Sequence, residues 1–347
     1  MLALVLIKNK CLKLLKVKQK KLLKKQYKIK INYTGICASD IPRAYSNGAY
    51  NYPLIMGHEF CGTIMQCGKE AKKFKKNDFV SAYPLVPKCK KCNSCKFGNF
   101  QLCKNYSYYG SRENGSMSEY LNVNEWNIFK LQKGVPPSLG CLMEPIAVAF
   151  NIFKNIINRD SKILILGSGF IGLILSGILN SKKFSNIDVL DRNAYKLSKL
   201  PNKNFKKLKY SLNFFNIKKK YDYTIDLIGN EESFQSCLDK TKESGVILLA
   251  ANIYKNINIS KKSLNLILRK ELTIKGIWNS TFKKYENNWD QAQDFILKNK
   301  NWILSLISHK VSLKESKNII KKIFYKKNFS KNKNFKYIKG VIKNNQI

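Results

Sequence analysis

The pattern of apolar and polar residues divides the chain into a strand-rich first part and a later part in which strands and helices alternate. Residues 24–33 alternate apolar and polar positions, which predicts a half-buried strand ending at the Gly35 turn. Short apolar runs between 51 and 80 are interrupted by glycines, and another strand is expected over 118–123. Few stretches before residue 139 have helical spacing. The first part therefore predicts a domain built mainly of strands.

The second part begins with apolar residues at three- and four-residue spacing, which predict a helix over 142–157. Strands and helices then alternate. The expected strands are 162–166, 187–190, 223–227 and 246–250, and the expected helices are 170–180 and 234–242. Such βαβ alternation implies a parallel sheet covered on both faces. Helices over 288–298 and 313–324 and a strand over 336–342 are expected towards the C-terminus.

The composition is that of a folded protein with about two domains. The chain has 347 residues, of which 44% are hydrophobic and 12% aromatic, so a disulfide-stabilised peptide and a disordered chain are both excluded. Its 64 Lys and Arg against 22 Asp and Glu give a net charge of +42, which raises the question of nucleic acid or an anionic membrane as partner. The lysines are spread along the whole chain, so a general drift of surface positions towards lysine is the simpler interpretation.

The chain shows no pattern of membrane insertion or export. The longest apolar run, 163–179, is short for a bilayer and contains glycines and serines. The apolar run 1–7 lacks a preceding basic region and a small-residue cleavage site. We therefore expect no membrane partner, a cytoplasmic location and reduced cysteines.

Four of the ten cysteines are crowded into one short segment. They form the pattern Cys-x2-Cys-x2-Cys-x7-Cys at Cys89, Cys92, Cys95 and Cys103. Four thiolates make the closed tetrahedral shell that zinc prefers, with no position left for a substrate. Iron–sulfur clusters also use dense cysteines, but the usual ferredoxin spacings differ from this one. The spacing therefore predicts a structural zinc site.

A second set of potential metal ligands is dispersed along the chain. Cys37 stands in GICASD, His58 and Glu59 stand in GHEFCG, and Glu144 precedes a proline. A thiolate, an imidazole and a carboxylate make an incomplete zinc shell, which leaves room for water or an alcohol oxygen. Each residue alone also suits an ordinary buried position. The chain has only two histidines, and the other, His309, lies in no metal motif, which favours His58 as a ligand.

A glycine-rich turn links the expected strand 162–166 to the expected helix 170–180. It has the dinucleotide-binding pattern GxGxxG, in the order Gly167, Ser168, Gly169, Phe170, Ile171 and Gly172. The glycines permit a tight turn and a close approach of pyrophosphate to the helix N-terminus. Asp191 ends the next strand, where a carboxylate accepts the ribose hydroxyls of NAD and repels the 2′-phosphate of NADP. Arg192 softens that preference, so NAD is expected ahead of NADP.

The ordered set GICASD, GHEFCG, the four-cysteine segment, EP, GSGFIG and the strand-end aspartate resembles the zinc-dependent medium-chain dehydrogenase/reductase family. The resemblance spans nearly the whole chain. It implies an α/β protein with a GroES-like, β-rich catalytic domain made of 1–145 and 281–347, and a Rossmann domain with a doubly wound parallel sheet made of 146–280. It also implies a substrate cleft between the two domains and a homodimer or homotetramer.

The resemblance further implies roles for individual residues. Cys37, His58 and Glu144 would hold a catalytic zinc, with Glu59 as an alternate ligand. Ser39 would pass the proton of the substrate alcohol towards solvent. Zinc would stabilise the alkoxide of that alcohol and NAD would accept the hydride.

Longer strings, among them YYGSRENGSMSEYL and RKELTIKGIWNS, are most similar to the galactitol-1-phosphate 5-dehydrogenase subgroup. They imply that galactitol 1-phosphate is oxidised to tagatose 6-phosphate, with Arg112 and Trp278 at the substrate. A solvated turn cation is the alternative for Arg112, and a core or interface aromatic residue is the alternative for Trp278. The alternative substrates are an unphosphorylated polyol such as sorbitol or L-iditol, or another secondary alcohol.

Two further alternatives lie outside an active dehydrogenase. A basic zinc-containing nucleic-acid-binding protein would account for the charge and the four cysteines, but would leave the glycine-rich turn unexplained. No specific nucleic acid is therefore expected as partner. An inactive member of the family would account for the lysine-rich, shortened segment after Asp191, but the retained zinc ligands argue against it.

Overall fold

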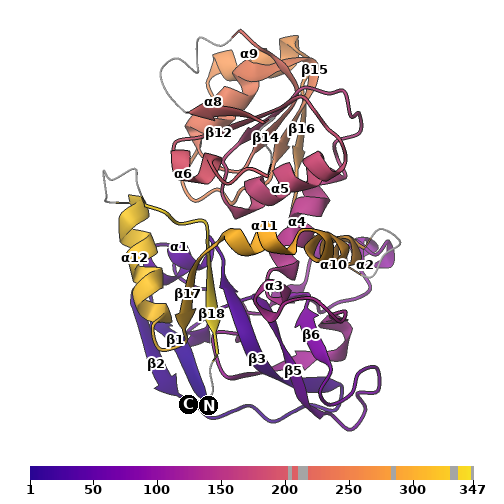
Figure 1. Ribbon diagram of the computed structural model, residues 1–347, viewed down its shortest axis with the longest axis vertical. Helices are drawn as coiled ribbons and strands as arrows, with labels where there is room; N and C mark the ends of the chain where they lie inside the picture. Colours follow the sequence, from indigo (N-terminus) through magenta and orange to yellow (C-terminus); the bar gives the residue numbers. More distant parts are fainter. Residues whose placement is uncertain (202–204, 210–217, 283–286, 329–334, 345–347) are drawn as a thin grey trace. The chain divides into compact units, whose positions relative to one another are not determined.

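The chain forms two compact units. The computed structural model describes residues 1–201, 205–209, 218–282, 287–328 and 335–344. Unit 1 comprises Met1–Ala147, Ser280–Asn332 and Lys339–Ile347, and unit 2 comprises Val148–Asn279 and Lys333–Ile338. Both ends of the chain belong to unit 1 (Figure 1). Within the described residues, no helix is long and apolar enough to cross a membrane.

Unit 1 is built mainly from strands, as the alternating pattern predicts. Its largest sheet has the order β10-β6-β5-β3-β18-β17, and β9 also pairs with β3. The strands are β3 (Gln26–Ile36), β5 (Glu59–Cys67), β6 (Phe79–Ala82), β9 (Tyr120–Asn124), β10 (Ile128–Lys130), β17 (Ile307–Ser312) and β18 (Lys339–Lys343). The prediction that the first of these ends at Gly35 is wrong, because Gly35 pairs with both Glu59 and Val341 inside the sheet.

An N-terminal hairpin, which the sequence analysis did not predict, forms a second sheet of unit 1. Strand β1 (Leu2–Lys8) pairs with β2 (Cys11–Lys16) and with β4 (Leu54–Ile55). Consecutive side chains of β1 from Ala3 to Leu6 are buried, so the strand lacks the apolar–polar alternation of a half-exposed one. A third sheet consists of β7 (Leu85–Pro87) and β8 (Tyr106–Tyr108).

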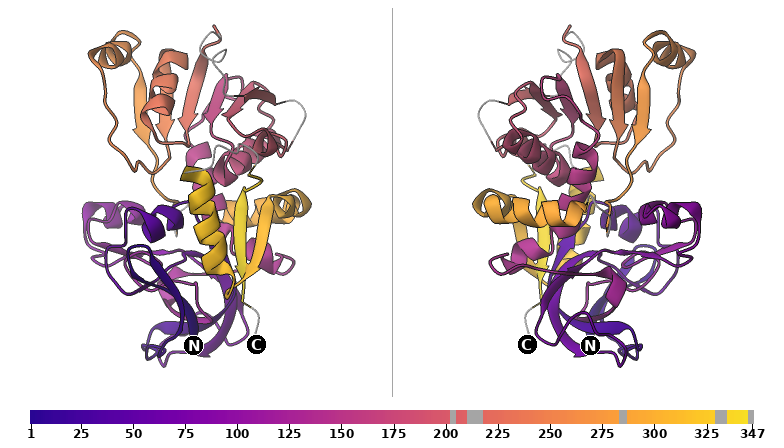
Figure 2. Two further views of the ribbon diagram at one scale, coloured as in Figure 1. Left: turned by 90° about the vertical axis from the view of Figure 1, so that its left-hand side faces the viewer. Right: turned by 90° about the vertical axis from the view of Figure 1, so that its right-hand side faces the viewer.

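Short helical segments connect the strands in the first part of unit 1. They are α1 (Asp40–Tyr45), α2 (Asn93–Lys96), η1 (Phe100–Leu102), η2 (Glu125–Asn127) and α3 (Pro137–Gly140). The C-terminal part adds α10 (Asn288–Lys298), α11 (Lys300–Ser305) and α12 (Ser316–Asn328). Helix α12, yellow in Figure 2, packs against α1, where the rings of Tyr45 and Phe324 stack with centroids 5.2 Å apart.

Unit 2 contains a parallel sheet with the order β13-β12-β11-β14-β15-β16. In chain order this is 3-2-1-4-5-6, the order of a Rossmann fold. The strands are β11 (Ile163–Leu166), β12 (Ile187–Asp191), β13 (Lys206–Lys209), β14 (Tyr221–Asp226), β15 (Thr241–Leu249) and β16 (Thr273–Gly276). Leu166 pairs with Leu190, so the carboxyl ends of β11 and β12 lie side by side. This register brings the glycine-rich turn next to the strand-end aspartate.

Helices cover the sheet of unit 2 (Figure 1). They are α4 (Met143–Phe153), which starts in unit 1, and α5 (Phe170–Ser181), α6 (Ala194–Leu197), α8 (Glu231–Lys240) and α9 (Lys261–Arg269). Phe234 and Leu238 of α8 pack against Leu164 and Leu166 of the sheet. Helix α8 starts before the predicted residue 234, because the Asn230 side chain accepts the backbone N–H of Ser233 and caps it.

Candidate metal and cofactor sites

The four crowded cysteines meet in one cluster in unit 1. The sulfur atoms of Cys89, Cys92, Cys95 and Cys103 all lie within 4.8 Å of one another. Helix α2 and the turn η1 fold the segment so that Cys89 Sγ is 3.3 Å from Cys103 Sγ. Backbone N–H groups of Cys92 and Lys91 donate to the Cys89 sulfur, and this lowers the pKa of that thiol to about 6. Four clustered sulfurs fit the tetrahedral shell of zinc.

The structure also brings together three of the dispersed ligands. Ligand atoms of Cys37, His58 and Glu59 lie within 4.8 Å of one another. Cys37 follows strand β3, and His58 and Glu59 stand at the start of β5, which pairs with β3. Gly57 has a φ of +93°, and a Cβ there would crowd Ser116 and Met117, so glycine is required at the turn that delivers His58.

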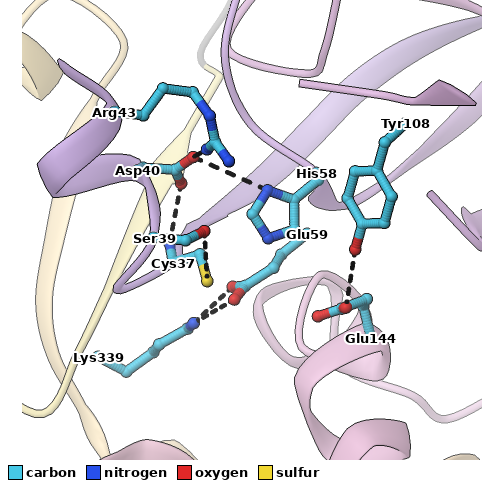
Figure 3. A network of polar contacts seen from close by, with 9 residues as sticks. All are labelled: Cys37, Ser39, Asp40, Arg43, His58, Glu59, Tyr108, Glu144 and Lys339. Carbon is cyan, nitrogen blue, oxygen red and sulfur yellow. Dashed lines mark hydrogen bonds and ion pairs between the residues drawn. The ribbon is translucent and has the colours of Figure 1, made fainter. Parts of the chain in front are cut away.

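A buried aspartate that the sequence analysis did not single out lies behind this cluster. Asp40 has no exposed surface and accepts the backbone N–H of Cys37 at 3.0 Å and Arg43 Nη1 at 3.0 Å. The Nδ1 atom of His58 lies 3.7 Å from Asp40 Oδ1 and has no hydrogen-bond partner among the described residues. Figure 3 shows the other ring nitrogen on the side of Cys37 and Glu59. A carboxylate behind the imidazole is the usual arrangement at a metal-binding histidine.

Glu59 has a buried partner from the far end of the chain. The Lys339 Nζ atom lies 2.7 Å from Oε1 and 2.5 Å from Oε2 of Glu59, and both side chains are at least 95% buried (Figure 3). The absence of a side chain at Gly35 makes room for this carboxylate, because a Cβ there would collide with Glu59 Oε2. The two partners are 280 positions apart in the chain, so no local pattern indicates the pair.

Glu144 lies beside the cluster of three rather than within it. It stands in the first turn of α4, is 6% exposed, and accepts a hydrogen bond from the Tyr108 hydroxyl at 3.3 Å (Figure 3). Burial raises the pKa of Glu144 to about 7, and the neighbouring His58 opposes that rise. The Tyr108 ring also meets the His58 ring edge-on, with centroids 5.6 Å apart. No motif in the sequence indicates a role for Tyr108.

The residues of this second cluster fit a zinc ion. Thiol, imidazole and carboxylate are the ligand types of catalytic zinc sites. Burial, followed by the charge of Glu59, raises the pKa of the Cys37 thiol to about 12, so a nearby cation is needed to make it a thiolate. The Ser39 hydroxyl lies 3.3 Å from Cys37 Sγ. Two carboxylates, Glu59 and Glu144, flank the thiol and the imidazole.

The glycine-rich turn of unit 2 has the geometry of a dinucleotide-binding turn. Gly167 has a φ of +104°, and a Cβ at Gly172 would collide with the Gly167 carbonyl oxygen. A Cβ at Gly169 would meet no atom within 4 Å, so the backbone there is open to a ligand. Helix α5 begins directly afterwards, with Phe170 buried and Ile171 partly exposed. This arrangement fits a pyrophosphate at the helix N-terminus.

Asp191 lies at the same turn. Its carboxylate accepts the backbone N–H of Ser168 at 2.8 Å and that of Asn193 at 2.8 Å. Lys196 Nζ lies 3.8 Å from the same carboxylate, and Arg192 is exposed. Parts of the lysine-rich segment after Asp191, residues 202–204 and 210–217, lie outside the described residues.

The two predicted substrate residues belong to different units. Arg112 follows β8 in unit 1, and its guanidinium lies over the rings of Tyr50 and Tyr106, 4.3 and 4.5 Å from their centroids. Its backbone N–H donates to the Tyr108 carbonyl at 2.9 Å. Arg112 is therefore a partly exposed cation that contacts two aromatic rings. Trp278 follows β16 in unit 2 and is 46% exposed, which excludes a core position and agrees with either a substrate or an interface position.

Known proteins resemble this chain both in its first domain and over most of its length. Residues 24–133 match the alcohol dehydrogenase GroES-like domain. Galactitol 1-phosphate 5-dehydrogenase of Escherichia coli (strain K12) is 26% identical over 303 residues, which are 83% of this chain and 86% of that protein. L-threonine 3-dehydrogenase of Pseudoalteromonas atlantica is 24% identical over 83% of this chain and 86% of that protein.

A solved structure shares the fold over its full length. The crystal structure of galactitol-1-phosphate dehydrogenase from Escherichia coli superposes with a TM-score of 0.85 over 99% of both chains, at 23% identity. This match confirms the combination of a GroES-like domain with a Rossmann domain. Residues 24–133 therefore form an alcohol dehydrogenase GroES-like domain, and the whole chain is similar in sequence and in fold to alcohol and polyol dehydrogenases.

Proposed function

We propose that this protein is a zinc- and NAD-dependent dehydrogenase of a sugar-alcohol phosphate, which oxidises galactitol 1-phosphate to tagatose 6-phosphate. One observation carries the proposal. Unit 1 gathers a thiol, an imidazole and a carboxylate at Cys37, His58 and Glu59, in a chain whose unit 2 has an open dinucleotide-binding turn at Gly169. A cation at the hydroxyl and a nicotinamide at the carbon together suit hydride transfer from a secondary alcohol.

Two zinc ions are proposed, one catalytic and one structural. Cys37, His58 and a carboxylate, Glu144 or alternately Glu59, would hold the catalytic ion. The four clustered cysteines would hold the structural ion. When bound, the catalytic zinc stabilises the ionised substrate hydroxyl and the nicotinamide of NAD accepts the hydride.

The remaining residues of the site orient groups and move a proton. Ser39 lies next to the Cys37 sulfur and is partly exposed, so we assign it the transfer of the hydroxyl proton from substrate to solvent. We assign Asp40, which accepts a hydrogen bond from Arg43 and lies 3.7 Å from His58 Nδ1, the orientation of the His58 ring when a metal ion is bound. The Lys339 ammonium supplies a counter-charge to the Glu59 carboxylate within the buried site.

NAD is proposed as the cofactor because of Asp191. Two backbone N–H groups hold its carboxylate, and an ionised carboxylate there accepts ribose hydroxyls and repels a 2′-phosphate. Lys196 and Arg192 reduce that repulsion without removing it. Fluorescence titrations with NADH and NADPH test the preference, and equal affinity for the two would contradict it.

A phosphorylated substrate is proposed because of Arg112. The guanidinium contacts the rings of Tyr50 and Tyr106 and donates to the Tyr106 hydroxyl at 3.3 Å, so these contacts reduce the side-chain entropy lost when it binds an oxyanion. Its loop also leads from Tyr108, which contacts Glu144. The proposed anion-binding residue and the proposed catalytic zinc ligands thus belong to the same unit.

The test compares galactitol 1-phosphate with free galactitol in the wild-type protein and in Arg112→Met. Loss of a charge-assisted contact to phosphate raises KM for the phosphate ester by roughly 10- to 100-fold and leaves turnover of galactitol unchanged. Arg159→Met, at an exposed position in unit 2, is the matched control and affects neither substrate. Turnover of sorbitol or L-iditol with no preference for phosphate would assign the protein to the polyol dehydrogenases instead.

We further propose that the protein is a cytoplasmic homodimer or homotetramer. Strand β16 ends the sheet of unit 2, and all four of its residues are exposed. Helix α9 next to it exposes Leu264 and Leu268 by 55% and 73%. An open edge beside apolar side chains suits antiparallel pairing with the same strand of a second copy. Light scattering should show a dimer or tetramer that Leu268→Glu converts to a smaller species; a wild-type monomer would contradict the proposal.

A further inference from the structure

Tyr108 touches two of the proposed ligands of the catalytic zinc at once. Its hydroxyl donates to Glu144 Oε1 at 3.3 Å, and its ring packs edge-on against the His58 ring. Glu144 comes from α4, His58 precedes β5, and Tyr108 ends β8. One side chain therefore links ligands from two separate parts of unit 1, as Figure 3 shows.

The two carboxylates beside Cys37 and His58 are held in different ways. Lys339 binds both oxygens of Glu59 as a buried ion pair. In the part of the chain that the structure describes, the hydrogen bond that holds Glu144 comes from the neutral Tyr108 hydroxyl. A carboxylate paired with a lysine must give up a strong ionic partner to bind a metal ion, whereas a long hydrogen bond to a hydroxyl costs little to rearrange.

The Tyr108 hydroxyl donates its hydrogen bond to Glu144 and carries no charge of its own. A neutral hydroxyl keeps the carboxylate in place without cancelling its negative charge, and that charge is what attracts the cation. The Tyr108 ring contact restricts the His58 ring, and Asp40 Oδ1 lies 3.7 Å from the Nδ1 atom of that ring. Groups that orient metal ligands in this way typically change metal affinity by 10- to 100-fold.

We propose that Tyr108 is a positioning residue of the catalytic metal centre, which holds Glu144 and His58 ready and makes Glu144, rather than Glu59, the carboxylate ligand. The inference rests on the proposed function, because it requires a metal ion at Cys37 and His58. It goes beyond that function, because it gives a role to a residue outside the ligand set and outside the substrate.

The experiment measures metal binding rather than turnover. Metal-free protein is titrated with Co²⁺ in competition with a chelator, and the absorption bands of the bound Co²⁺ report its ligand field. Tyr108→Phe keeps the ring but removes the hydroxyl, and is expected to lower Co²⁺ affinity of the catalytic site about tenfold and to alter its spectrum. Tyr109→Phe is the matched control, because the Tyr109 hydroxyl accepts the backbone N–H of Asn124 instead; it should leave both readouts unchanged.

Two further variants distinguish an absent metal centre from a metal centre in which Tyr108 has no role. Cys37→Ser reports the ions that bind elsewhere, so equal stoichiometry in Cys37→Ser and wild type would overturn the metal centre and the proposed function with it. If the wild type binds one more ion than Cys37→Ser, unchanged affinity in Tyr108→Phe overturns only the role of Tyr108. In a Glu144→Gln background, Tyr108→Phe should cause little further loss, since it acts largely through Glu144. A full tenfold loss in that background would also contradict the proposal.

Discussion

Replacing Glu144 by glutamine should stabilise the metal-free protein at high pH. The carboxyl is buried in unit 1, and burial raises its pKa from the ordinary value of 4.5 to about 7. When pH rises above 4.5 the unfolded chain releases this proton, but the folded protein retains it until pH approaches 7. The contribution of Glu144 to the free energy of unfolding is therefore most favourable below pH 4.5, falls as pH rises towards 7, and stays at its lowest value above that. Glutamine has no charge to bury and removes this pH dependence.

The size of the effect follows from the two pKa values. The difference between 4.5 and about 7, at 1.36 kcal/mol for each pKa unit, corresponds to about 3 kcal/mol in total. Part of that loss has already occurred at pH 5, because the unfolded carboxyl is then mostly ionised. Between pH 5 and pH 8 the stability of Glu144→Gln relative to wild type should therefore rise by roughly 2–3 kcal/mol.

The assay is urea denaturation of metal-free protein at pH 5 and pH 8. Glu70→Gln is the control, because Glu70 forms an exposed ion pair with Lys24 and such pairs contribute little. Saturating zinc should reverse the order at pH 8, since the wild-type carboxylate then gains a cation. A stability difference between Glu144→Gln and wild type that is the same at both pH values would refute the reasoning.

Three other predictions test the remaining parts of the structure. Lys339→Met leaves the buried Glu59 carboxylate without its cation and should lower the free energy of unfolding in urea by about 3–5 kcal/mol. Adding Glu59→Gln to this variant should restore most of the lost stability. A double variant that is no more stable than Lys339→Met would show that the two side chains are not coupled. Gly169→Ala should weaken NADH binding at least tenfold in fluorescence titrations, because its Cβ occupies the space open to pyrophosphate. Gly276→Ala, also in open space, is its control, and normal NADH binding by Gly169→Ala would exclude this turn as the pyrophosphate site. Cys103→Ser should remove one of two zinc ions per chain in metal analysis and lower the thermal midpoint; unchanged zinc content would contradict a four-cysteine site.

The parts of the site that could be predicted from sequence are those built from neighbouring residues. The four cysteines lie close together in the chain, and Gly167 to Gly172 form one turn, so spacing alone indicates their geometry. The alternating pattern also predicts the strand that leads to Cys37, but not its end, because pairing with β18 extends it past Gly35.

The parts that could not be predicted depend on contacts between distant segments. Lys339 reaches Glu59 because β18 pairs with β3, and β3 pairs with β5; in the sequence it is one lysine among many. Tyr108 and Glu144 meet only after β8 and α4 have packed in unit 1. The strand β1 was missed because its consecutive buried residues show no period of two.

The most direct test of the proposed function follows the hydride itself. Zinc-loaded protein is incubated with NAD and galactitol 1-phosphate that carries deuterium on the carbon to be oxidised, and the NADH formed is analysed by mass spectrometry. Deuterium in the NADH of the wild type, and no NADH from Cys37→Ser, is the predicted result. Absence of NADH from this substrate and from galactitol, sorbitol and L-iditol, with both zinc sites filled, would contradict it.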